Sequence, residues 1–124
     1  DVSVWWLENY ADGYRGSQGS IDIQAACHHL TKDKSGPSNF DTPGPNLWGV
    51  VGRPKASVGG FPYSSALKNA GGSWDYEALN RWLTHPIRTF PGTVMIFGFE
   101  QNREKRIDLI AYLRTLSDNP KPLP

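Results

Sequence analysis

The chain contains a single cysteine, Cys27, and the next residue is His28. A thiol beside an imidazole has three ordinary uses: an inert buried thiol, a nucleophile with its base, or a covalent tether next to a metal ligand. The nucleophile is the weakest of these, because neighbouring residues on a helix point about 100° apart and no acidic side chain stands nearby to orient the imidazole. The inert thiol and the tether both remain open on this fragment alone.

The tether interpretation matches half of a known motif. Haem is attached covalently at Cys-x-x-Cys-His, and here Gln24 stands where the first cysteine would be. A haem iron takes one ligand on each face, and a His/Met pair favours electron transfer. The only methionine, Met95, lies in a predicted loop far from His28. That position suits a second ligand, although a lone methionine is also commonly a core filler.

Residues in the middle of the chain could complete such a site. A ligating imidazole needs an acceptor for its second N–H, and the carbonyl of Pro45 is a candidate. The two carboxylates of a haem need hydrogen-bond donors, for which Arg53, Tyr63 and Trp74 are candidates.

Composition sets limits on fold and function. At 124 residues the chain predicts one domain. A net charge of +1 gives no field of the kind that nucleic-acid binding requires. No apolar run approaches the ~18 residues that cross a bilayer, and the start at Asp1 without a signal peptide suggests a processed or trimmed chain. Small loop-rich domains often need a cross-link or a bound group for stability. One cysteine excludes an internal disulfide, so any such group would be a metal or a cofactor.

Periodicity and capping residues predict an all-α fold. Helices are expected at residues 21–28, 63–70, 74–84 and 102–116. Ser64 or Ser65 would cap the helix at 63–70, and Ser73 would cap the next, which Pro86 would end. There is no clear strand pattern.

Turn residues fill the remaining segments. Residues 30–60 and 87–101 are predicted loops, and a loop as long as the first is uncommon unless it surrounds something functional. The prolines after Ser117 predict an extended tail. His29 is expected at the surface and His85 at a helix end, and the histidines and cysteine lack a recognisable zinc-ligand spacing.

Several further motifs follow Cys27-His28 in a fixed order. They are Gly44-Pro45-Asn46-Leu47-Trp48-Gly49, Gly52-Arg53, Tyr63-Ser64, Trp74, Pro91-Gly92-Thr93-Val94-Met95-Ile96-Phe97 and Asp108-Leu109-Ile110-Ala111-Tyr112-Leu113. Together they resemble class I cytochrome c, in its mitochondrial and alphaproteobacterial branch. From Gly44 to Ser117 the spacings match the family without gaps.

The resemblance implies an all-α class I cytochrome c fold, in which three main helices, shorter helices and long loops surround one haem. The domain would span residues 21–117. Residues 1–20 would form an N-terminal extension and the start of the first helix, and residues 118–124 an extended Pro-rich tail. The last helix would cross the first near Gly16.

The resemblance also implies a role for each matching residue. His28 and Met95 would be the two iron ligands, and Cys27 would form the one thioether of a haem c. Pro45 would accept a hydrogen bond from His28. Arg53, Tyr63 and Trp74 would hold the haem propionates. Thr93 would lie near a propionate and the ligand loop, and Trp82 beside the methionine.

Three departures from the family pattern matter. Just before the motif, where the family has an apolar and aromatic helix face, this chain has Gly19-Ser20, so the expected helix crossing would be weaker. Gln24 allows at most one thioether, as in a minority of cytochromes from protist mitochondria; engineered removal of the cysteine is the other explanation. The ring of lysines that usually steers mitochondrial members is sparse. Apolar or neutral residues stand in its place at Ile23, Ile87, Val94 and Gln101. Weaker steering and more apolar docking are therefore expected.

The implied function is that of an electron carrier, with single electrons passing between redox partners such as a cytochrome bc1-type complex and a terminal oxidase or dehydrogenase. It would be no enzyme, because both ligand positions of the iron would be filled. Weak peroxidase activity would require Met95 to leave the iron. The alternative is a haem-bound, or haem-free, accessory subunit of a larger membrane complex, docked through the Val4-Trp5-Trp6-Leu7 arm. The expected compartment is the periplasm or the mitochondrial intermembrane space.

Overall fold

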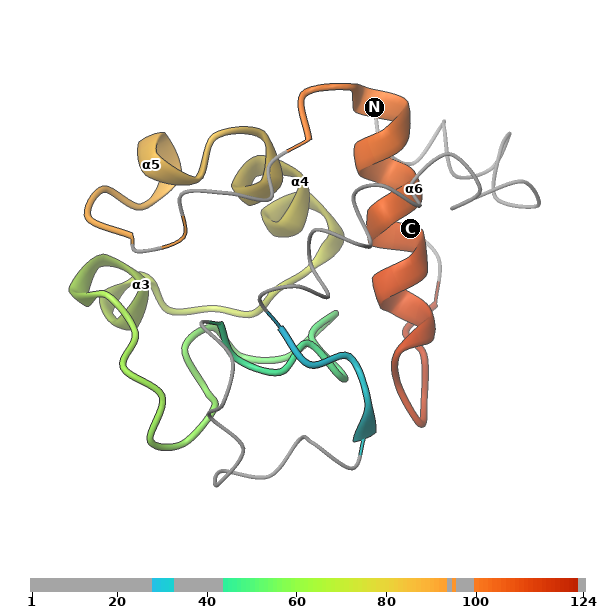
Figure 1. The fold of residues 1–124 in the computed structure, drawn as a ribbon, viewed down its shortest axis with the longest axis horizontal. Helices are drawn as coiled ribbons and strands as arrows, with labels where there is room; N and C mark the ends of the chain where they lie inside the picture. The colour runs from blue at the N-terminus through green and yellow to red at the C-terminus, as the bar shows by residue number, and fades with distance from the viewer. Residues whose placement is uncertain (1–27, 33–43, 94, 96–99, 123–124) are drawn as a thin grey trace.

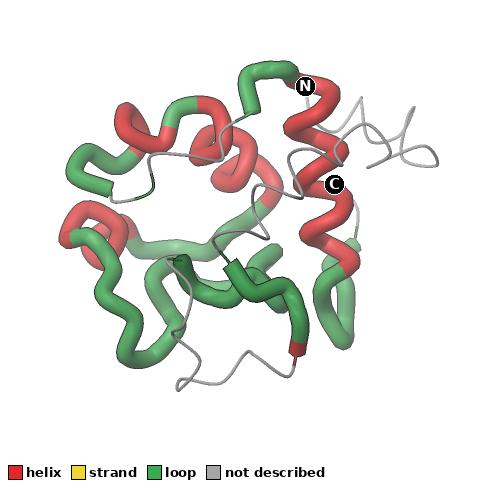
Figure 2. Tube along the Cα trace, in the orientation of Figure 1, coloured by secondary structure: helices red, strands yellow, loops and turns green. Residues whose placement is uncertain are grey.

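The computed structural model describes residues 28–32, 44–93, 95 and 100–122. Its helices are α3 (Ser65–Ala70), α4 (Tyr76–Thr84), α5 (Pro86–Thr89) and α6 (Arg103–Thr115). Loops join them, and the described part of the chain has one isolated β-bridge and no strand (Figure 2). The predicted all-α class is therefore confirmed. The predicted helix at 21–28 and the crossing near Gly16 lie outside the described residues, apart from His28, which is not helical.

The predicted cap of α3 is confirmed. The Ser64 hydroxyl accepts a hydrogen bond from the Leu67 N–H at 3.3 Å, and the helix ends at Gly71, whose φ of 69° favours glycine. The predicted cap of α4 is wrong, because the cap is Asp75, which accepts from the Ala78 N–H at 2.7 Å, and not Ser73.

Long-range pairing explains the late start of α4. Gly52 N–H donates to the Trp74 carbonyl at 2.7 Å, and Trp74 N–H donates to the Arg53 carbonyl at 2.8 Å. Lys55 N–H then donates to the Gly72 carbonyl at 3.0 Å. Residues 72–74 are thus held extended against residues 52–55, and a helix cannot begin there.

Residues 87–89, which were predicted to lie in a loop, belong to the short helix α5 that begins at Pro86. His85 ends α4, as predicted for a helix-end residue, and its N–H donates to the Arg81 carbonyl at 3.1 Å. Pro86 follows at the first position of α5, where its fixed φ and missing N–H are tolerated. The turn of chain that leads towards Met95 is therefore partly helical.

Helix α6 forms one side of the core and packs against α4 (Figure 1). Its apolar residues Ile107, Leu109, Ile110, Ala111 and Leu113 are buried. Arg106 is buried with them, and its Nε donates to Asn80 Oδ1 of α4 at 2.6 Å. This bond fixes the two helices to each other.

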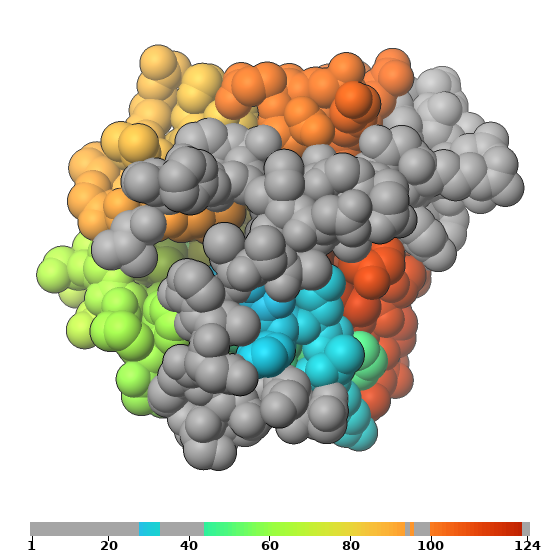
Figure 3. Space-filling view, viewed as in Figure 1, coloured from blue at the N-terminus to red at the C-terminus, as the bar shows by residue number. Residues whose placement is uncertain are grey.

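The C-terminal segment folds back onto the body. After a bend beyond α6, the Lys121 carbonyl accepts from Arg114 Nε at 2.6 Å and from Tyr76 Oη at 3.2 Å. Lys32 forms an ion pair with Asp118 at 2.7 Å, and Figure 3 shows residues 28–32 lying against this end of the chain. The tail is extended only in its last described residues, and its separation from the domain at residue 118 stays a prediction.

We expect Asp75→Ala to lower the free energy of unfolding by about 1 kcal/mol, because α4 loses its N-cap. Ser73→Ala, two residues away and exposed, should change it by less than half as much. Urea unfolding followed by circular dichroism measures both. Equal losses in the two variants would contradict the assignment of the cap to Asp75.

Stability should also depend on the ionisation of Asp108 in α6. Its Oδ1 is buried without a partner, and burial, with a smaller effect of Glu104, raises its pKa to about 6. Because folding raises the pKa from 3.8 to about 6, ionisation opposes folding: the cost is small near pH 4, grows as pH rises, and is complete above pH 6. We expect Asp108→Asn to gain roughly 1–3 kcal/mol of stability relative to the parent between pH 4 and pH 8. Urea titrations at pH 4 and pH 8 measure this gain, and Glu77→Gln, at an exposed position, is the control. If the stability difference between Asp108→Asn and the parent did not change with pH, the raised pKa of Asp108 would be contradicted.

Candidate functional site

His28 is the first described residue of the chain and is buried. Its Nδ1 lies 2.6 Å from the Pro45 carbonyl oxygen. A carbonyl can only accept, so Nδ1 carries the proton and Nε2 keeps its lone pair. Burial lowers the pKa of His28 and exceeds the opposing effect of the Pro45 bond, with Arg53 lowering it further. The imidazole is thus neutral and oriented, which is the state of a metal ligand.

Backbone contacts hold the segment of His28 against residues 44–47. Leu47 N–H donates to the His29 carbonyl at 2.9 Å, and Asn46 Nδ2 donates to the Thr31 carbonyl at 3.0 Å. A side chain at Gly44 would overlap the His28 ring. Only glycine lets the chain pass this close to the imidazole, so Gly44 fixes the ring from one side and Pro45 from its edge.

Arg53 is the second candidate that the structure places in this region. Its Nη1 donates to the carbonyls of Asn46 at 2.9 Å and Trp48 at 3.2 Å. Its Nε is buried and has no hydrogen-bond partner. A buried guanidinium with an unused donor is costly unless an anion completes it. Burial accordingly lowers the pKa of Arg53, and Tyr63 partly offsets the effect.

Tyr63 lies close enough to Arg53 for the guanidinium charge to lower the pKa of the phenol, although by less than burial raises it. Its hydroxyl oxygen accepts from the Val58 N–H at 3.1 Å, a bond that leaves the phenolic proton free to be donated elsewhere. Burial is the main cause of its raised pKa. The phenol therefore stays protonated, as a donor to a carboxylate must.

Trp74, Trp82 and Phe90 form an aromatic cluster. The ring centroids are 5.6 Å apart for the two tryptophans, 5.4 Å for Trp82 and Phe90, and 6.3 Å for Trp74 and Phe90. Both tryptophans are buried, and Met95 packs on the core that contains them. The expected neighbourhood of Trp82 and the methionine is consistent with this packing.

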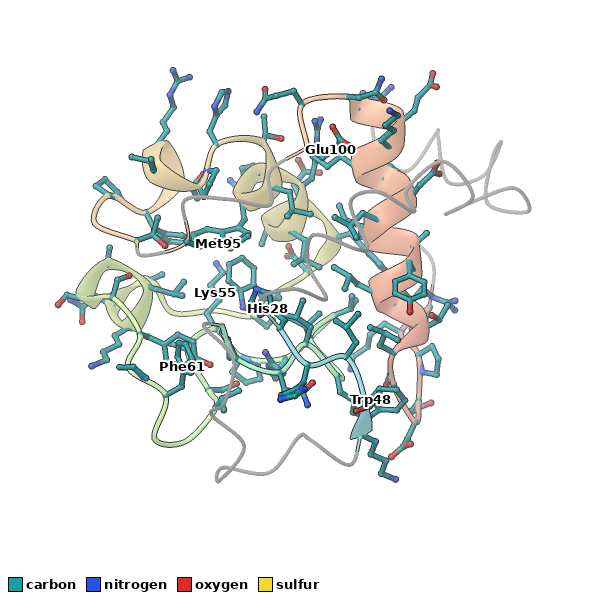
Figure 4. All side chains as sticks on the ribbon, viewed as in Figure 1. His28, Trp48, Lys55, Phe61, Met95 and Glu100 are labelled. Carbon is teal, nitrogen blue, oxygen red and sulfur yellow. The ribbon has the colours of Figure 1, made fainter. Side chains whose placement is uncertain are left out.

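Thr93 holds the backbone of Met95. Its Oγ1 accepts from the Met95 N–H at 3.2 Å, and its own N–H donates to the Phe90 carbonyl at the same distance. Gly92, with φ of 87°, makes the turn just before. Figure 4 shows the side chains of His28 and Met95 projecting towards the same central part of the molecule from opposite sides.

Two residues of this region were missed from the sequence. Asn46 is buried, and its Oδ1 accepts from the Trp48 N–H at 2.7 Å, so that both carbonyls bound by Arg53 lie in one fixed turn. A polar residue in an otherwise apolar stretch was the available signal. Lys55 places its Nζ over the rings of Trp74 and Phe90. Its spacing of two from Arg53 carried no recognised signal.

The described residues fit the haem that the resemblance implies. They supply an imidazole with a lone pair on Nε2, a thioether sulfur and a buried guanidinium whose Nε awaits an acceptor. They contain no group of three His, Cys, Asp or Glu side chains that could hold a metal ion by themselves. Cys27 and Gln24 lie outside the described residues. No helix in the described ranges is long and apolar enough to cross a membrane.

Comparisons with known proteins identify relatives of this chain. No family model matches the chain. It is 37% identical to cytochrome c of Euglena viridis over 107 residues, which cover 86% of the chain and 99% of that protein. It is 44% identical over 100 residues to a cytochrome c homolog of Bradyrhizobium diazoefficiens, which cover 80% of the chain and only 52% of that relative, so the chain spans about half its length.

A solved structure has the same fold. Cytochrome cH from Methylobacterium extorquens superimposes with a TM-score of 0.70 at 34% sequence identity, over 83% of this chain and 98% of that one. The two proteins therefore share sequence as well as fold, over nearly the whole length of the solved chain.

We expect Gly44→Ala to displace the His28 ring and to lower the free energy of unfolding by about 1–3 kcal/mol through overpacking. Gly59→Ala is the matched control, because nothing lies within 4 Å of a methyl group there. Denaturant unfolding of both variants measures the effect. A Gly44→Ala protein as stable as the control would contradict the close approach of backbone and imidazole.

Proposed function

The chain belongs to the class I cytochrome c family of haem-containing electron carriers, and we propose that His28 and Met95 are the axial ligands of its iron. The hydrogen bond from His28 Nδ1 to the Pro45 carbonyl carries this proposal. It leaves Nε2 as the only ring nitrogen with a lone pair, on a buried neutral imidazole. Met95 is the only thioether in the chain.

When bound, a haem c supplies an iron that accepts and releases one electron. The protein residues keep that exchange simple. His28 and Met95 would both ligate the iron and so keep substrates from it, and a soft thioether would favour the reduced form. Trp74 and Trp82 are buried, and the partly buried Phe90 and Met95 pack against the core that contains them, so this side of the site is apolar.

We assign the haem carboxylates to Arg53, Tyr63 and Trp74. Arg53 offers a buried Nε without a partner, and Tyr63 offers a phenolic proton that its bond to Val58 does not use. Thr93 would act on the ligand loop, because it already holds the Met95 N–H. Trp82 would pack beside the methionine.

Cys27 would supply the only covalent bond to the haem, a single thioether next to its ligand His28. Gln24 stands at the position of a second attachment and cannot form one. Non-covalent contacts must then hold the other side of the ring, which gives the buried donors and the aromatic cluster a larger share in retaining the cofactor.

Redox proteins such as a cytochrome bc1-type complex and a terminal oxidase or dehydrogenase are the proposed partners, in the periplasm or the mitochondrial intermembrane space. Ile87 on α5 is 56% exposed, next to exposed Arg88. This pair supports docking that is more apolar than a lysine ring would give. The second candidate, an accessory subunit of a membrane complex, has as its support the Val4-Trp5-Trp6-Leu7 segment of the sequence.

Intact mass under denaturing conditions, paired with a reduced visible spectrum, tests the attachment. We expect the mass of the polypeptide plus one haem, and loss of the haem mass in Cys27→Ala. Met95→Leu should lower the reduction potential by on the order of 100 mV, because the ligand that favours reduced iron is gone. A haem spectrum on a polypeptide of unmodified mass would contradict the thioether, and an unchanged potential in Met95→Leu would contradict its role as ligand.

A further inference from the structure

Lys55 and Arg53 lie on one face of an extended segment. Pro54 forms an isolated antiparallel bridge with Ser73, so the residues on either side of each pair share a face. Arg53 is thereby opposite Trp74, and Lys55 is opposite Gly72. The pairing that delays α4 also points two cations towards the same side of the molecule.

The position opposite Lys55 is open. Gly72 has φ of 72°, and a methyl group added to it would come within 4.0 Å of the Lys55 ammonium. The Lys55 side chain lies over the indole. Its Nζ lies 5.4 Å from the centroid of the Trp74 ring and 5.6 Å from that of Phe90. Both rings belong to the aromatic cluster of the proposed haem site.

This environment is unusual for an ammonium. Lys55 is half-buried and, among the residues that the structure describes, forms no ion pair with a carboxylate. Aromatic faces attract a cation, but at about 0.5–2 kcal/mol they replace only part of its hydration. On the same face, Arg53 Nε is buried and unpartnered. Two cationic side chains thus lie on one face of residues 53–55, one with a buried donor that lacks an acceptor and the other with aromatic rings in place of a carboxylate.

We propose that Lys55 binds a haem carboxylate, as a second cation beside Arg53 in the cofactor site. The inference rests on the proposed function, since it takes the haem to lie between His28 and Met95. Figure 4 shows Lys55 directed to the same central part of the molecule as these two side chains. A dianionic edge would satisfy both cations, and Lys55 would hold positive charge close to the iron.

The test compares Lys55→Met with Lys55→Arg in the haem-loaded protein. Methionine keeps an aliphatic stem on Trp74 and removes the charge, whereas arginine keeps the charge. Loss of a nearby cation favours oxidised iron. We expect Lys55→Met to shift the redox equilibrium about threefold to tenfold, a fall in reduction potential of roughly 30–60 mV, with Lys55→Arg close to the parent. Lys55→Gln is a second neutral variant in case methionine impairs folding.

Lys68→Met is the control, because it makes the same change of charge at an exposed position on α3. Resonance Raman spectra provide a readout independent of potential: the carboxylate bending modes of the haem should shift in the neutral Lys55 variants alone. Lys55 variants that match Lys68→Met in potential and leave these modes unchanged would overturn the proposal. The visible spectrum reports axial ligation separately, so failure of His28 or Met95 as ligand would be recognised without affecting this comparison.

Discussion

The hydrogen bond between His28 Nδ1 and the Pro45 carbonyl is the constraint on which the site depends. It fixes the tautomer, and so decides which nitrogen can bind a metal. It also fixes the ring direction, and Gly44, which has no side chain, lets the backbone pass close to the ring in that orientation. Two segments distant in sequence must meet to make it, and the bonds of Leu47 and Asn46 to the His29–Thr31 backbone bring them together. The imidazole is therefore positioned by the fold as a whole.

A second constraint organises the opposite edge of the site. The pairing of residues 52–55 with residues 72–74 places Arg53, Lys55 and Trp74 on one face. It also postpones α4 until Asp75, so the helix that carries Trp82 starts in a defined register. The same backbone bonds thus set the position of two cations and the direction from which the aromatic cluster approaches Met95.

The sequence predicted the parts of this structure that local signals determine. The period of α6 and the Ser64 cap needed no knowledge of distant contacts, and both are confirmed. The motifs resembling a family identified His28, Pro45 and Met95 as candidates. Long-range pairing was invisible to such signals. Because of this pairing, Ser73 does not cap α4, and Lys55 lies over Trp74. Neither outcome follows from the propensity or spacing of the residues near them.

Charge burial connects the fold to the cofactor. Arg53 and His28 both lose hydration, and each has its pKa lowered for that reason. The histidine avoids the free-energy cost of a buried charge because it stays neutral, as a metal ligand must. Arginine cannot do so, and it keeps a buried Nε without an acceptor. A protein gains nothing by retaining such a group in an apolar interior unless binding supplies the missing anion. The unpaired donor, next to the neutral His28, therefore supports an anionic ligand at this part of the site.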